Sequence, residues 1–445
     1  MQFYLFNVTN ADEVLAGGKP RLVQMGPYTY KERREKFDIV WNHNGTVTYK
    51  QNRTFTFLPD MSAGNETDLV TTVNPLIPVL AHNYHLLSST LSWGMSWIMG
   101  DEKLFFTRPV KEVLWGYDDP VLSYANGLLP GMFPRKNIGY FMRRNFTDDG
   151  VYTVSTGAED ISTLGDVTAW NYKDSLDIWT TNSSNMINGS DGSLGPPFMF
   201  NVSESSVYVS DICRSIRGVY LQDVHVKGIR LRRFGGDPYD MANASVNPQN
   251  YGFCTPAGTP IDKCLPSGLL NSTKCQEPVN GFDLPIIFSF PHFLNADPKV
   301  GDKFIGLSPN EAEHETAIDM EPWTGLVLQV AKRLQINILV EQSPDLKDKT
   351  LNVTRMFFPI LWINESSVTN DKYADMLKDQ LFWPKQLAET GRVVMAIAGS
   401  ALTLLCGLLL VWHHWRVTSS KHAYTRPSPG LELEDETKLP VYMDR

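Results

Sequence analysis

The sequence predicts a mainly β, mainly antiparallel fold with one helical region and a single C-terminal membrane-spanning helix. Segments in which apolar and polar residues alternate, bounded by Gly, Pro and Asn, recur through the body of the chain. Residues 69–100 instead carry no charged side chain and show helical spacing, and residues 393–412 form an uninterrupted apolar run. With 42% apolar and 20% charged residues in 445, the chain has the composition of a globular protein.

The clearest predicted strand covers residues 324–341, where apolar and polar side chains alternate with a period of two. It is too long for one flat strand, so a bend is expected. The same pattern predicts strands at residues 219–231, 284–290, 356–363, 46–58 and 151–154.

The uncharged segment 69–100 predicts a helical hairpin, with Asn74 as the N-cap and Pro75 as the first helical residue. A second membrane span is disfavoured because two prolines, His82, Asn83 and His85 make insertion costly. Two interpretations are weighed equally: a helix packed on the core, and an exposed apolar cap that meets ligands.

Residues 393–412, VVMAIAGSALTLLCGLLLVW, have the length and composition of a transmembrane helix. Arg392 precedes them, and Trp412, Trp415 and Arg416 resemble an interfacial belt at the other end. Because basic residues flank the cytosolic side of a span, the tail of residues 413–445 is predicted to lie in the cytosol.

N-x-S/T sequons are spread along the chain before this span, and none follows it. Residues 1–385 are therefore predicted to form a glycosylated lumenal or extracellular ectodomain. The opening residues MQFYLFNVTN do not read as a signal peptide, so an N-terminal anchor is expected upstream. The predicted glycosylation sites are Asn7, Asn44, Asn52, Asn65, Asn145, Asn182, Asn188, Asn201, Asn243, Asn271, Asn352 and Asn364.

Four cysteines are predicted to form two disulfides, since Cys406 lies within the predicted span. An oxidising compartment favours disulfides, and neither the C-x2-C spacing of zinc sites nor a redox C-x-x-C occurs. Spacing alone leaves three pairings open for Cys213, Cys254, Cys264 and Cys275.

Charge and motifs argue against several classes of function. A formal net charge of -9 without long basic runs argues against a nucleic-acid partner. No nucleophile-elbow, zinc-protease, phosphate-loop or dinucleotide-binding motif occurs, so neither an enzyme nor a metal or other cofactor is predicted. His314, between Glu313 and Glu315, and the pair Asp148–Asp149 are read as solvated or turn-forming residues rather than catalytic ones.

Several ordered stretches resemble the class B scavenger receptor family from about residue 3 to the apolar run. They include FNVTNADEVLAGGKPRLVQMGPYTYKE from Phe6, VLWGYDDPVLS from Val113, PHFLNADP from Pro291 and GLSPNEAEHETAIDMEPWTG from Gly306. The resemblance implies a large antiparallel β-barrel ectodomain with a hydrophobic tunnel, an apical helical bundle at about residues 72–130, and two flanking membrane anchors. It also implies that Cys213 pairs with Cys275 and Cys254 with Cys264.

The resemblance implies a receptor that binds lipoproteins or lipids and passes fatty acid, cholesterol or cholesteryl ester through the tunnel to the membrane. Phospholipid and a second copy of the chain are further expected partners, and the plasma membrane is the expected location. The alternative is a lysosomal sorting receptor, in an endosomal or lysosomal membrane, that holds a lumenal hydrolase through the apical helices. The ligand-binding residues expected there are Leu80, His82, His85, Leu87, Leu91, Trp93, Trp97 and Lys103.

Two features qualify the apical expectation. Asp101 and Glu102 beside Lys103 weaken a preference for acidic ligands, and His82 and His85 have the chemistry of a pH switch. The tail lacks an acidic dileucine signal because Leu439 is followed by Pro440.

Overall fold

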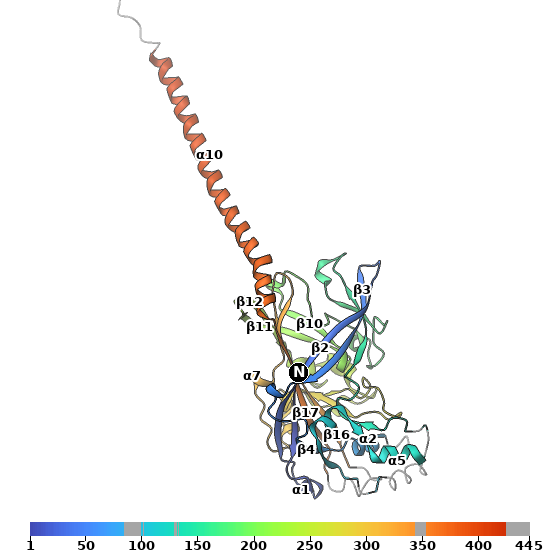
Figure 1. Cartoon of the computed structure of the whole chain (residues 1–445). Coiled ribbons are helices and arrows are strands. Elements are labelled where there is room, and N and C mark those ends of the chain that lie inside the picture. The colour runs from blue at the N-terminus through green and yellow to red at the C-terminus, as the bar shows by residue number, and fades with distance from the viewer. Residues whose placement is uncertain (84–98, 101, 129–130, 132, 343–352, 424–445) are drawn as a thin grey trace, which may run out of the picture. The chain divides into compact units, whose positions relative to one another are not determined.

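The computed structural model describes residues 1–83, 99–100, 102–128, 131, 133–342 and 353–423. It contains two compact units, Met1–Asn370 and Asp371–Arg445. The first unit is built on a 13-stranded antiparallel sheet in the order β10-β11-β12-β15-β16-β17-β1-β2-β3-β8-β9, with β13 and β14 attached to β16 (Figure 1). The mainly β, barrel-like fold expected from the sequence is confirmed.

The strands of this sheet are β1 (Gln2–Val8), β2 (Leu22–Trp41), β3 (Thr46–Phe57), β8 (Thr147–Ser155), β9 (Val167–Trp170), β10 (Glu204–Val209), β11 (Arg214–Val226), β12 (Ile229–Gly236), β13 (Leu270–Asn271), β14 (Ile286–Ser289), β15 (Ala317–Met320), β16 (Val327–Val340) and β17 (Met356–Val368). Two small sheets pair β4 (Leu69–Val73) with β5 (Phe105–Pro109) and β6 (Tyr117–Asp118) with β7 (Asn137–Ile138). Among the described residues of this unit, the α-helices are α1 (Ala11–Leu15), α2 (Leu76–Asn83), α4 (Val110–Trp115), α5 (Pro120–Leu128), α6 (Pro298–Gly301) and α7 (Glu311–His314).

The two ends of the sheet path approach each other through one short segment. Ser190 bridges Val207 of β10, and it also bridges Asp166, which immediately precedes β9. Backbone pairing therefore continues from the last strand toward the first, which gives the nearly closed barrel.

Two of the predicted strands form a long antiparallel pair within the sheet. Strand β16 pairs with β17 from Gln329 opposite Val368 to Val340 opposite Met356. Its register shifts between Ile336 and Asn337, inside the segment for which a bend is expected.

The predicted strand 219–231 is wrong as a single element. Residues Lys227 and Gly228 have φ angles of 50° and 79°, so the chain reverses between β11 and β12. A two-residue turn with positive φ at both positions matches the twist of a hairpin. The two turn residues are Lys-Gly rather than the Asn-Gly or Asp-Gly that usually indicates such a turn, so the sequence pattern did not predict it.

The expected helical hairpin at 69–100 begins instead as a strand, because residues 69–73 form β4 and pair with β5. Helix α2 follows, and the Asn74 Oδ1 accepts a hydrogen bond from the Leu76 backbone N–H at 3.1 Å. The N-cap is therefore where it was expected. The second half of the expected hairpin lies outside the described residues.

The second unit is helical. It comprises α9 (Asp371–Leu377), a π-helical turn at Lys378–Phe382 and α10 (Trp383–Ala423). Within the described part of the chain, Asp371–Ser420 is the one helix long and apolar enough to cross a membrane, and it contains the predicted span 393–412. Cys406 in this helix is a free thiol.

Candidate functional site

Two cavities lie in the β unit. The first has a volume of about 570 Å³ and is lined by apolar side chains of α2, β14 and β16, among them Leu76, Leu80, Phe288 and Ile336. The second has a volume of about 990 Å³ and reaches toward β12, β15 and the start of β16, with Phe234 and Met320 in its wall. Cavities of this size and composition are typical of sites for small apolar ligands.

The two cavities share part of their lining. Nine residues line both of them, and five of the nine are charged. The shared residues are Met1, Arg53, Asp149, Ser210, Asp211, Phe288, Lys332, Leu334 and Glu365. The surface common to the two largely apolar cavities is therefore mostly polar.

The charged residues belong to one network, here called the ion-pair cluster. It comprises four acidic and four basic side chains. Its members are Glu32, Arg34, Arg53, Arg144, Asp149, Asp211, Lys332 and Glu365.

Asp211 is the most connected carboxylate of the cluster. Its Oδ1 accepts from Arg144 at 3.0 Å and from Arg53 at 3.3 Å, and its Oδ2 accepts from the Lys332 ammonium at 3.0 Å. Lys332 also lies 3.5 Å from Glu365 Oε2. A single carboxylate thereby joins cations from β3, β16 and the loop before β8.

Two further branches complete the cluster. Arg34 pairs with Glu365 and donates to Glu32 at 2.7 Å, which ties β2 to β17. Arg53 also pairs with Asp149. The Asp149 Oδ2 accepts from the Tyr152 hydroxyl at 2.8 Å and from the Ser210 hydroxyl at 3.0 Å.

The pairing keeps Asp211 and Lys332 ionised. Burial by itself would raise the pKa of Asp211, but the charges of Arg53, Lys332 and Arg144 outweigh it and hold this pKa well below the usual range. Burial likewise opposes the charged form of Lys332, yet Glu365 and Asp211 raise its pKa above the ordinary value. The cluster is therefore a set of charges, most of them half-buried, that depend on one another.

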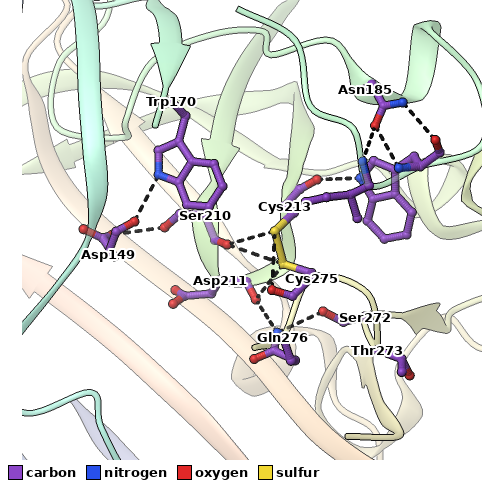
Figure 2. Close-up of a disulfide and its surroundings, with 12 residues drawn as sticks. Asp149, Trp170, Asn185, Ser210, Asp211, Cys213, Ser272, Thr273, Cys275 and Gln276 are labelled. Carbon is purple, nitrogen blue, oxygen red and sulfur yellow. Dashed lines mark hydrogen bonds between the residues drawn. A yellow bond between two sulfur atoms is a disulfide. The ribbon is translucent and has the colours of Figure 1, made fainter. Parts of the chain in front are cut away.

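A disulfide holds one edge of the cluster. Cys213 is bonded to Cys275, and Figure 2 shows Ser210 and Asp211 beside this bond, with Asp149 connected through the Ser210 hydroxyl. The Gln276 side chain donates to the Asp211 carbonyl at 3.1 Å, so the chain after Cys275 also contacts the Asp211 backbone. The second disulfide joins Cys254 and Cys264; both pairs are those that the family resemblance implies.

The sequence did not indicate this cluster. Asp149 reads as a turn former, and the other charges lie in separate segments whose pattern is that of solvated surface. The alternation on β16 and β17 was the available signal: Lys332 and Leu334 share a face of β16, and Ile363 and Glu365 share a face of β17.

The structure describes only some of the expected apical residues. Leu80 is buried on α2 and lines the first cavity rather than an outer surface. His82 is half-buried on the same helix, and Lys103 is exposed before β5. His85, Leu87, Leu91, Trp93 and Trp97 lie outside the described residues.

The sequons differ in how their asparagines are held. Asn44, Asn65, Asn182, Asn188 and Asn201 are exposed, whereas Asn7, Asn52, Asn145, Asn243, Asn271 and Asn364 are half-buried and Asn352 lies outside the described residues. The Asn243 Nδ2 donates to the carbonyls of Leu265 at 2.8 Å and Cys264 at 3.5 Å. A glycan is attached through this same nitrogen.

We expect Asn243 to remain unglycosylated in the folded protein and Asn201, which is exposed, to carry a glycan, because a sugar on Asn243 would displace both carbonyl contacts. Peptide mass spectrometry after enzymatic deglycosylation in heavy-oxygen water measures the occupancy of each site. Full occupancy at Asn243 would contradict the expectation.

A buried histidine pair lies elsewhere in the unit. The rings of His292 and His314 stack with centroids 4.4 Å apart. His292 Nε2 is 2.7 Å from Gln24 Oε1, and its Nδ1 accepts from the Ser308 backbone N–H at 3.0 Å. Burial, with a smaller contribution from His314, lowers the pKa of His292 to about 4, so the ring is neutral at physiological pH.

Comparison with known proteins agrees with this architecture. The family model described as the CD36 family matches residues 1–410. Lysosome membrane protein 2 of Mus musculus is 36% identical over 415 residues, which cover 93% of this chain and 82% of that protein. Scavenger receptor class B member 1 of Mus musculus is 33% identical over 410 residues, or 91% of this chain and 77% of that protein. The chain belongs to the CD36 family, the class B scavenger receptor family that its sequence resembles.

Proposed function

We propose that this membrane receptor binds lipids or lipoproteins and passes fatty acid, cholesterol or cholesteryl ester through the two cavities toward the membrane. The observation that carries the proposal is the pair of largely apolar cavities with a common wall inside one β unit. A lipid that moves from one cavity to the other keeps its hydrocarbon out of water, which lowers the barrier to transfer.

The proposed arrangement follows the sequence. Residues 1–385 form an extracellular or lumenal ectodomain, residues 393–412 span the membrane and residues 413–445 lie in the cytosol. Lipoproteins or a protein ligand dock on the apical region near residues 72–130, phospholipid is a further ligand, and copies of the chain self-associate. The plasma membrane is the proposed location, and the activity is that of a receptor rather than an enzyme.

Replacing Leu334 with tryptophan tests the transfer route. Leu334 lines both cavities, so a larger ring there should narrow the passage and slow uptake of a fluorescent cholesteryl ester about tenfold, which corresponds to about 1.4 kcal/mol of added barrier. Uptake is measured in cells that express equal surface amounts of each chain.

The matched control is Val23→Trp, because Val23 is exposed on β2 and lines neither cavity. We expect the control to take up the ester as the parent chain does. Equal uptake by the Leu334 variant and the parent would rule out this route.

The second candidate is a lysosomal sorting receptor that binds a lumenal hydrolase through its apical helices. The identity to lysosome membrane protein 2, 36% against 33% to the scavenger receptor, favours it. Imaging of a tagged chain separates the two candidates: residence in acidic vesicles with little at the cell surface would favour the sorting receptor.

A further inference from the structure

We propose that the ion-pair cluster binds the hydroxyl group of a neutral lipid, such as a free sterol or a monoacylglycerol, and selects such lipids against free fatty acid anions. This assignment rests on the proposed passage of lipids through the two cavities. It gives that passage a chemical preference and names the residues that set it.

The position of the cluster is the first argument. Arg53, Asp149, Asp211, Lys332 and Glu365 line both cavities, and the second cavity is also lined by further charged residues such as Arg217 and Asp240. A lipid in either cavity therefore has the shared charged surface within reach.

The charged groups also present surface to the cavities. The side chains of Lys332, Glu365 and Asp211 keep 28%, 23% and 19% of their surface accessible, although they form the core of the network. A ligand in either cavity can contact them without first breaking an ion pair.

The charge balance of the cluster decides which head group fits. Four acidic and four basic side chains neutralise each other among the described residues. An added carboxylate would leave one negative charge uncompensated in the interior, which is costly. A hydroxyl adds no charge, so the balance favours a neutral polar head.

Two polar atoms of the cluster are left without a hydrogen-bond partner. In the described part of the chain, Arg53 Nε and Asp149 Oδ1 are buried and have no hydrogen-bond partner. Their side chains keep only 5% and 4% of their surface accessible. Buried polar groups are normally paired, and both residues line the two cavities, so a small shift of these side chains would let a polar ligand satisfy the unpaired donor and acceptor.

A hydroxyl has the matching chemistry, since it can donate to Asp149 Oδ1 or accept from the Arg53 Nε–H. An ionised carboxylate can only accept, and a hydrocarbon without a polar end can do neither. The cluster therefore discriminates by hydrogen bonding against the hydrocarbon and by charge against the fatty acid.

Competition for a photoreactive sterol with a free hydroxyl tests the assignment. The full chain in detergent micelles is incubated with the probe and with cholesterol, with cholestane, which lacks the hydroxyl, or with palmitate. We expect cholesterol to compete about tenfold better than cholestane, a difference of about 1.4 kcal/mol, and better than palmitate. Equal competition by all three lipids would overturn the assignment but leave the proposed function standing.

A change of charge tests the role of the balance. Glu365→Gln leaves the cluster with an excess positive charge, so palmitate should compete about tenfold better relative to cholesterol than it does in the parent chain. Asp149→Asn makes the same charge change from another strand and is the second variant.

Asp319→Asn is the matched control. Asp319 is 1% accessible and pairs with Arg233, but neither residue lines a cavity. We expect its palmitate-to-cholesterol ratio to equal that of the parent. Unchanged ratios in folded Glu365 and Asp149 variants would contradict the assignment, whereas failure of every lipid to displace the probe from the parent would contradict the proposed function itself.

Discussion

Replacing Arg53 with methionine should destabilise the β unit by about 3–5 kcal/mol, the usual cost of removing one partner of a buried ion pair. Arg53 keeps 5% of its surface accessible and pairs with both Asp149 and Asp211. Burial alone would lower its pKa, but these two carboxylates raise it above the ordinary value, so the native state binds the charged form strongly.

The main penalty should come from the carboxylates that remain. Asp211 keeps Arg144 and Lys332 as partners, whereas in the described part of the chain the Asp149 carboxylate keeps the hydroxyls of Tyr152 and Ser210 and no cation. Adding Asp149→Asn to Arg53→Met should therefore recover part of the lost stability, because it removes the stranded charge.

Thermal unfolding of the full chain in detergent, followed by tryptophan fluorescence, measures these changes. Arg33→Met is the control, since Arg33 is 68% accessible and its pair with Glu35 is solvated. A melting temperature for the Arg53 variant equal to that of the control would show that the buried pairs contribute little.

The sequence predicted the parts of the fold in which one face is apolar. The alternation at 324–341 located β16, and the capping residue Asn74 located the start of α2. The sequence did not predict strand β2, Leu22–Trp41. Its residues from Lys31 onward are exposed or half-buried, and its charged residues show no alternation with apolar ones. Such a strand is defined by its neighbours β1 and β3 rather than by its own pattern.

The candidate site was harder to predict than the fold. The apolar lining was implied by the long strands, but sequence does not say which face encloses a cavity and which fills the core. Arg53, Asp211 and Glu365 come from three distant parts of the chain, and only the closure of the sheet brings them together. Their pairing is a property of the tertiary structure.

Acidification should destabilise the β unit through His292. An unfolded histidine has a pKa of about 6.5, and in the native state the pKa is about 4, because burial and the neighbouring His314 disfavour the charged ring. Above pH 6.5 both states are neutral and the full stability is present. As the pH falls from 6.5 to 4, His292 is protonated in the unfolded state but stays largely neutral in the native state. This difference lowers the free energy of unfolding by about 3 kcal/mol.

His314 should act in the same direction. Burial lowers its pKa too; Glu313 opposes this effect, and Arg333 adds to it. At about pH 5, the lower end of the range that histidine switches sense, more than half of the loss from His292 should already be present. Residence in an acidic compartment would thus require stability from elsewhere in the protein.

His292→Gln removes the titrating ring but keeps an amide that can pair with Gln24 and accept from the Ser308 N–H. Its melting temperature should fall less steeply than that of the parent between pH 7 and pH 4, while the variant of the exposed His43, His43→Gln, should follow the parent. Many carboxylates also titrate in acid, so the slope of one chain does not isolate His292. The difference in slope between the parent and the His292→Gln variant isolates the effect of His292. Identical slopes would mean that the buried ring takes up its proton without loss of the native state.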